Sequence, residues 1–217
     1  MVFAHPDDEV IFGWPILQNE QYDKELIICA SDLHNGARPY WSHRRYVLEA
    51  LCEQLNIPVY CFDFNSGFYK YPARGQIRKY QLLSLAKQYF DKKKPPALHK
   101  ACEAILNEIG KREYDYIFTH NFWGEYGHLD HILINSLLFN NISSPILISD
   151  IYIQNSYLVP LSQIGHPLRN LLHEYIHSQH VVNREFYDFC ANIYERRKVW
   201  TWSSPPVASA NLYLIEK

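Results

Sequence analysis

An imidazole and two carboxylates stand within four consecutive residues near the start of the chain, at His5, Asp7 and Asp8. Histidine nitrogens and aspartate oxygens are common ligands of divalent metals, and Pro6 stiffens the turn between them. We therefore expect His5 and Asp8 to face one metal ion, while Asp7 accepts a proton from a water at that ion. Glu9 fits the first turn of a following helix. The alternative is a pair of helix-capping aspartates with an incidental histidine.

A second group of chemically active residues runs from Trp123 to His131. His128 and His131 are three residues apart at the start of an expected helix, so both lie on one face of it. One of them would complete a His-Asp-His metal set, and the other would donate a proton or a hydrogen bond to an oxyanion. Three protein ligands with an open position are typical of catalytic zinc sites. Two surface histidines that cap a helix are the alternative interpretation.

The composition indicates one globular domain, because 47% of the 217 residues are apolar and 20% are charged. A net charge of −2 gives no reason to expect nucleic acid or an anionic membrane as a partner. The five cysteines are scattered without a CxxC pair, and no segment approaches the roughly 20 apolar residues of a membrane-spanning helix. With no signal peptide visible, we expect a cytoplasmic protein with reduced thiols and no membrane span.

Short apolar runs alternate with longer amphipathic runs, which predicts a single Rossmann-like α/β domain, a mostly parallel sheet flanked by helices. The expected strands are Met1–Ala4, Glu25–Ala30, Val59–Phe64, Tyr114–His120, a segment near Ile146–Ile153, and Asn211–Ile215. The expected helices are Ser42–Leu55, Leu98–Arg112, His128–Phe139, the Leu168–Val181 stretch, and Asn183–Val199. Residues 65–97 break the alternation and are interpreted as an excursion or lid. Both groups of active residues then fall at the carboxyl ends of strands, where such sheets bind ligands.

The segments Ala4–Glu9, which reads AHPDDE, and Gly127–His131, which reads GHLDH, resemble the hallmarks of the PIG-L/LmbE-like zinc-dependent de-N-acetylases. The two motifs and the order of elements cover most of the chain. The resemblance implies hydrolysis of an N-acyl group, usually the acetyl of an N-acetylglucosamine unit in a small sugar or glycoconjugate. Zinc is the implied metal, although a His-Asp-His set also suits other divalent ions.

The resemblance also distributes roles among the residues of the two motifs. It implies that the metal ligands are His5, Asp8 and His131, and that Asp7 is the general base. His128 would stabilise or protonate the tetrahedral intermediate, and Asp130 would orient a histidine.

Five further residues are candidates for contact with the substrate, namely Arg44, Arg45, Trp123, Glu125 and Tyr126. The chain departs from the family's usual Arg-then-Glu helix motif, of which only Arg44-Arg45 remain, and a solvated helix face is their alternative role. It also has Asn65-Ser66-Gly67 where family members often carry a sugar-contacting Asp, so the resemblance does not fix the identity of the substrate.

Two other functions compete with this interpretation. His173, Glu174 and His177 match the HExxH zinc-metallopeptidase motif, with Glu195 as a third ligand. That motif comes late in the chain, lacks the sheet context of such peptidases and would leave both earlier motifs unexplained. A non-catalytic carbohydrate-binding relative of the de-N-acetylases would keep the fold without turnover, and the intact set of ligands and base argues against it.

Overall fold

The computed structural model describes residues 1–29, 42–62, 96–154, 157–160, 175–200, 202 and 204–215. The expected excursion at 65–97 therefore lies outside the described residues, except for its last two positions, which begin a helix. The side chains of Ser42, residues 96–99, Tyr126 and Leu129 also lie outside that description.

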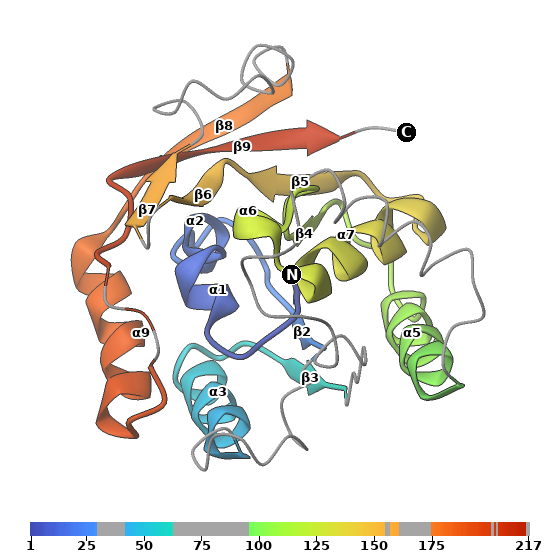
Figure 1. Ribbon diagram of the computed structural model, residues 1–217, viewed down its shortest axis with the longest axis horizontal. Helices are drawn as coiled ribbons and strands as arrows, with labels where there is room; N and C mark the ends of the chain where they lie inside the picture. The colour runs from blue at the N-terminus through green and yellow to red at the C-terminus, as the bar shows by residue number, and fades with distance from the viewer. Residues whose placement is uncertain are drawn as a thin grey trace.

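A seven-stranded sheet forms the centre of the molecule, in the order β3-β2-β1-β4-β5-β9-β8 (Figure 1). The strands are β1 (Val2–Phe3), β2 (Leu26–Ile28), β3 (Val59–Cys61), β4 (Ile117–Thr119), β5 (Ile146–Ser149), β8 (Ile176–Val181) and β9 (Ser209–Ile215). The first five in that order are parallel, while β9 runs antiparallel to β5 and β8 antiparallel to β9. The prediction of a mostly parallel sheet flanked by helices is confirmed.

Helices cover both faces of the sheet because its strands are apolar on both sides. Helices α1 (Asp8–Ile11), α2 (Trp14–Leu17), α3 (Ser42–Gln54) and α9 (Arg184–Arg196) lie on one side, and α5 (Pro96–Ile109) and α7 (Leu129–Asn141) on the other (Figure 1). Neighbouring residues of β1 show the alternation, since Phe3 packs into the core under α1, α2, α3 and α9, whereas Val2 packs under α5 and α7.

Two sequence predictions of elements are wrong. The single strand expected near Ile146–Ile153 is β5 followed by β6 (Ile151–Gln154), which leaves the central sheet and pairs with β7 (Tyr157–Pro160). The break falls at Asp150, whose amide N–H donates to the Asn211 carbonyl at 3.1 Å. The helix expected over Leu168–Val181 is, in its described part, the edge strand β8, because its backbone pairs with β9.

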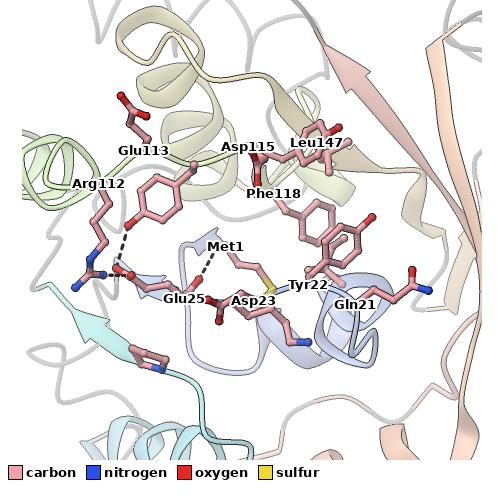
Figure 2. A pocket seen from close by; sticks show the side chains of 15 residues that line it. Met1, Gln21, Tyr22, Asp23, Glu25, Arg112, Glu113, Asp115, Phe118 and Leu147 are labelled. Atoms are coloured by element: carbon pink, nitrogen blue, oxygen red, sulfur yellow. Dashed lines mark hydrogen bonds and ion pairs between the residues drawn. The ribbon is translucent and has the colours of Figure 1, made fainter.

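A cavity of about 630 Å³ opens at the amino ends of the strands (Figure 2). Met1 and Glu25 line it from the starts of β1 and β2, and Asp115 from the start of β4. Two of its charged groups pair with each other, since Arg112 forms an ion pair with Glu25, and the Tyr114 hydroxyl donates to the same carboxylate at 3.1 Å. The two predicted motifs follow the carboxyl ends of the strands, so this cavity lies at the opposite edge of the sheet from them.

Helix α9 fixes the turn that carries the first motif, through a buried hydrogen bond. The Tyr194 hydroxyl donates to Oε1 of Glu9 at 2.5 Å, and Oε2 of the same carboxyl accepts the Asp7 backbone N–H at 2.9 Å. Both Glu9 and Tyr194 have 0% exposure, so neither partner can turn to water if the other is removed. Burial raises the pKa of Glu9 to about 8.

We expect Tyr194→Phe to lower the free energy of unfolding by about 1–3 kcal/mol, because it leaves Oε1 of the buried Glu9 carboxyl without its hydroxyl donor. Tyr187→Phe is the matched control on the same helix, since the buried Tyr187 hydroxyl has no hydrogen-bond partner among the described residues. Denaturant unfolding at constant pH would measure both variants. Equal stability of Tyr194→Phe and wild type would contradict the prediction.

Candidate metal centre

The two motifs meet because β1 and β4 are neighbouring parallel strands. Val2 is in register with Thr119, so the segments that follow them leave the sheet side by side at its carboxyl edge. The short helix α6 (Gly124–Gly127) and then α7 return the second motif over this edge. The first motif turns directly into α1, with the Asp7 carbonyl accepting the N–H groups of Val10 and Ile11 at 3.0 and 2.9 Å.

Three donor atoms from the expected ligands lie at nearly equal distances from one another. Nδ1 of His5 is 3.2 Å from Oδ2 of Asp8 and 3.2 Å from Nε2 of His131, and the latter two atoms are 3.4 Å apart. Metal–ligand bonds of about 2.0–2.2 Å at tetrahedral angles would separate donor atoms by roughly 3.3–3.6 Å. The donor set therefore fits a tetrahedral divalent ion.

Each of the two histidines in this set has its other ring nitrogen on a carboxylate. Nε2 of His5 lies 3.3 Å from Oδ2 of Asp130, and Nδ1 of His131 lies 2.5 Å from Oε2 of Glu125. A carboxylate at one ring nitrogen favours the proton on that nitrogen, which leaves Nδ1 of His5 and Nε2 of His131 as lone-pair donors toward Asp8. The tautomers are thus assigned from the hydrogen-bond partners.

The charge states also suit a metal site. Burial by itself raises the pKa of Asp8, but the neighbouring His131 and His5 hold it well below its usual value, so the carboxylate is ionised. Burial, with His120 nearby, lowers the pKa of His131, which keeps that imidazole neutral. An anionic oxygen and neutral nitrogens are the forms in which these side chains bind metals.

Other groupings of three side chains also bring donor atoms together, namely His5, His128 and His131, and Asp8, His120 and His131. The second grouping uses Nε2 of His120, which already accepts the Ala4 backbone N–H at 2.9 Å. A nitrogen whose lone pair is held by a backbone donor is a poor ligand. His120 therefore serves better as a support for the ligand set than as a member of it.

His128 lies at the more open side of the cluster. Its side chain is 18% exposed, against 1% for His131, and its ring centroid is 4.7 Å from that of His5. Nδ1 of His128 accepts the Asp130 N–H at 3.3 Å, which caps α7. Burial, together with His131 and His5, holds the pKa of His128 well below its usual value.

Asp7 takes a strained backbone conformation that turns its side chain away from the helix it precedes. Its φ angle is 102°, and its carboxylate makes no capping hydrogen bond to α1. Instead, Oδ2 of Asp7 forms an ion pair with the buried guanidinium of Arg44, a residue of α3. The guanidinium neutralises a carboxylate that would otherwise be costly to bury.

The structure distributes the candidate substrate residues differently. Arg44 is buried on Asp7, whereas Arg45 is exposed and pairs with Glu49 of its own helix at 2.8 Å. Glu125 has 0% exposure and lies behind His131, and Trp123 is half-buried in the loop before it. The side chain of Tyr126 lies outside the described residues. Substrate contacts by these residues stay predictions.

Two supporting residues were not identified as site residues from the sequence. His120 has no partner at a ligand spacing in the sequence, and its one signal is that it follows β4 directly. Tyr194 lies 185 residues from its partner Glu9, and no local pattern marks it.

The peptidase alternative conflicts with the described part of its motif. His177 lies in β8, and its ring centroid is 5.2 Å from that of Tyr116. The two histidines of a zinc-binding HExxH motif are four residues apart, and a helix brings them together on one face. A strand does not bring them together in this way. His173 and Glu174 lie outside the described residues.

The chain is similar to known deacetylases in sequence and in structure. A family model described as PIG-L: GlcNAc-PI de-N-acetylase matches residues 1–142. A protein of Acanthamoeba polyphaga mimivirus, named uncharacterized protein L374, is 27% identical over an alignment 180 residues long. The alignment covers 76% of this chain and 68% of that protein.

Three solved structures share the fold. The deacetylase of teicoplanin biosynthesis in complex with teicoplanin has a TM-score of 0.55 at 13% identity, covering 99% of this chain and 97% of that one. The zinc-inhibited form of teicoplanin deacetylase Orf2 also has a TM-score of 0.55 at 13% identity, with 98% and 96% covered. For the A40926 pseudoaglycone deacetylase Dbv21 the TM-score is 0.50 at 16% identity, with 92% and 79% covered. Among the described residues, no helix has the length and apolar character needed to span a membrane.

We expect Arg44→Ala to lower the free energy of unfolding by about 3–5 kcal/mol, because it removes the buried guanidinium that pairs with the buried Asp7 carboxylate. Arg45→Ala is the matched control, since it removes an exposed pair worth at most about 1 kcal/mol. Adding Asp7→Asn to Arg44→Ala should recover part of the loss, as a double-mutant cycle would show. Similar effects of the two arginine substitutions would contradict the assignment.

Proposed function

Since this chain belongs to the PIG-L family of GlcNAc-PI de-N-acetylases, we propose that it is a metal-dependent hydrolase. Its substrate would be an N-acetylglucosamine-type sugar or glycoconjugate, from which it removes the N-acyl group, acetyl in the usual case. The observation that carries this proposal is the triangle formed by Nδ1 of His5, Oδ2 of Asp8 and Nε2 of His131. A buried carboxylate, Asp7, stands beside this triangle in sequence and is not one of its members.

The metal that His5, Asp8 and His131 would hold supplies an acidified water and polarises an amide carbonyl. We propose zinc, and the same donor set also accepts other divalent ions. Of the protein's own groups, Asp7 accepts the proton as water adds to the carbonyl carbon. The Arg44 guanidinium holds that carboxylate in place.

His128 is suited to the other half of the reaction, because it lies on the more open side of the cluster. When the C–N bond breaks, the amine nitrogen must gain a proton, and His128 would hold and deliver it. The products are a carboxylate, acetate in the usual case, and a free amine on the sugar.

We expect Asp7→Asn to keep one metal ion per chain and to lose about 100- to 10,000-fold in turnover, because it removes the proton acceptor and not a ligand. Metal analysis after dialysis and a free-amine assay on N-acetylated sugars would measure the two properties. Full activity of Asp7→Asn would disprove its role as the base. A wild type that binds metal and turns over none of these sugars would favour a non-catalytic relative.

We expect His131→Ala to lose bound metal, because it removes one of the three proposed ligands, a histidine whose other ring nitrogen is paired with a carboxylate. His177→Ala is the matched control, since this histidine is exposed on β8. Metal content of the purified variants would separate the two outcomes. Loss of metal in His177→Ala with retention in His131→Ala would revive the peptidase interpretation.

A further inference from the structure

We propose that Glu125 is a positioning residue of the metal centre and that His120 is its partner in this role. The two side chains hold His131 in the tautomer and orientation that direct its Nε2 atom into the ligand triangle. This inference rests on the proposed function, because it assigns the residues behind the metal site rather than the site itself. On this proposal Glu125 acts behind the metal site instead of contacting substrate.

The contacts of Glu125 use both of its carboxylate oxygens. Oε2 lies 2.5 Å from Nδ1 of His131 and 3.2 Å from Nδ1 of His120. Oε1 accepts the Asn121 backbone N–H at 3.1 Å, and the Glu125 N–H donates to Oδ1 of Asn121 at 2.8 Å. The carboxylate is fully buried, so its position is set by these partners and not by solvent.

Hydrogen-bond partners assign the tautomers of the two histidines. The Ala4 N–H donates to Nε2 of His120, which therefore carries no proton in the neutral ring. The proton of His120 then lies on Nδ1, the atom 3.2 Å from Oε2 of Glu125. The same carboxylate oxygen is the hydrogen-bond partner of Nδ1 of His131, so Nε2 of His131 is left with its lone pair toward Asp8 and His5.

Ring packing also restricts the orientation of the His120 and His131 imidazoles. The His120 and His131 rings stack with centroids 3.7 Å apart and an interplanar angle of 13°. The ring of Phe12 meets both of them edge-on, at 6.1 and 5.8 Å between centroids. The His131 ring therefore cannot turn about its Cβ–Cγ bond without displacing His120.

The backbone at Glu125 shows that the position is maintained against a cost. Its φ angle is 56°, in the left-handed region that residues with a Cβ rarely adopt. The preceding Gly124 has a φ angle of 63°, and a Cβ there would lie 2.9 Å from a side-chain carbon of Ile132. Such strain, of order 1–3 kcal/mol, persists only where surrounding contacts over-determine it. Here those contacts are the ones between Glu125 and its partners.

The test measures the affinity of metal-stripped protein for Zn²⁺ by competition with a chelator. We expect Glu125→Gln to weaken zinc binding about 10- to 100-fold, because a neutral amide orients and polarises His131 less than a carboxylate does. In the Co²⁺-loaded protein, its visible absorption spectrum should change, since the ligand field depends on the orientation of His131. A purely structural role of Glu125 would not predict a changed spectrum in a folded variant.

Asp150→Asn is the matched control, because Asp150 is another fully buried carboxylate at the carboxyl edge of the sheet and binds Asn211 instead of a ligand. It should keep the wild-type affinity for Zn²⁺. If Glu125→Gln does not fold, Glu125→Asp provides the second variant, since it keeps the charge and withdraws it from His131 by one methylene. We expect this variant to weaken zinc binding as well.

The outcomes separate the two proposals. Wild-type zinc affinity and an unchanged Co²⁺ spectrum in a folded Glu125 variant would overturn the positioning role and leave the proposed function intact. A wild-type protein that binds neither Zn²⁺ nor Co²⁺ would overturn the proposed function itself. Equal weakening in Asp150→Asn would show a general effect of buried carboxylates at this edge, and it would also overturn the positioning role.

Discussion

Removing a cluster of ionisable side chains from water is the constraint on which this structure depends. His5, Asp8, Glu125 and His131 are all at most 7% exposed, and an isolated buried charge costs several kcal/mol. The chain meets this cost by placing the carboxylates of Asp7, Asp8, Glu125 and Asp130 against an imidazole or a guanidinium. Burial raises the pKa of Glu125, but His120 and His131 together hold it at about 2. These pairings keep the carboxylates ionised without exposing them.

The same pairings explain why so much of the fold converges on a few atoms. Helix α3 supplies Arg44 to the Asp7 carboxylate, and α9 supplies the Tyr194 hydroxyl to Glu9. Strand β1 provides the Ala4 N–H that fixes His120. Elements far apart in the sequence thus each contribute one polar contact, and the apolar faces around them exclude the water that would compete for it.

The sequence was sufficient for the parts of the site that local spacing and sheet topology determine. His5 and Asp8 are close in the chain, and the carboxyl ends of parallel strands meet at one edge, so their meeting with a histidine of the second motif could be predicted, and the family resemblance implied His131. The sequence could not predict which carboxylate pairs with which histidine, because that pairing depends on the left-handed turn at Glu125. The pairing of Arg44 with Asp7 depends equally on how α3 lies over the sheet.

The errors in the fold have a similar physical origin. The described end of the Leu168–Val181 stretch is an edge strand, and an edge strand lacks the continuous apolar run that marks the buried strands. The residues of β8 are exposed or half-buried along its whole length, so the hydrophobic periodicity of this stretch did not indicate a strand. The strand near Ile146–Ile153 was one apolar run, and the change of sheet at Asp150 comes from its hydrogen bonds to Asn211.

The distribution of roles between the two motifs has a consequence for folding. The segment Glu125–His131 would provide one of the proposed ligands, and it contains both of the carboxylates that contact the proposed ligand histidines, whereas Ala4–Glu9 would provide the other two ligands. The complete donor set therefore exists only when β1 has paired with β4, more than 110 residues away in the chain. A metal ion at 100 times its dissociation constant would add about 2.7 kcal/mol to the stability of that paired state. Binding of the proposed metal and pairing of β1 with β4 would then be one coupled equilibrium, in which the site would help to hold together the strands that build it.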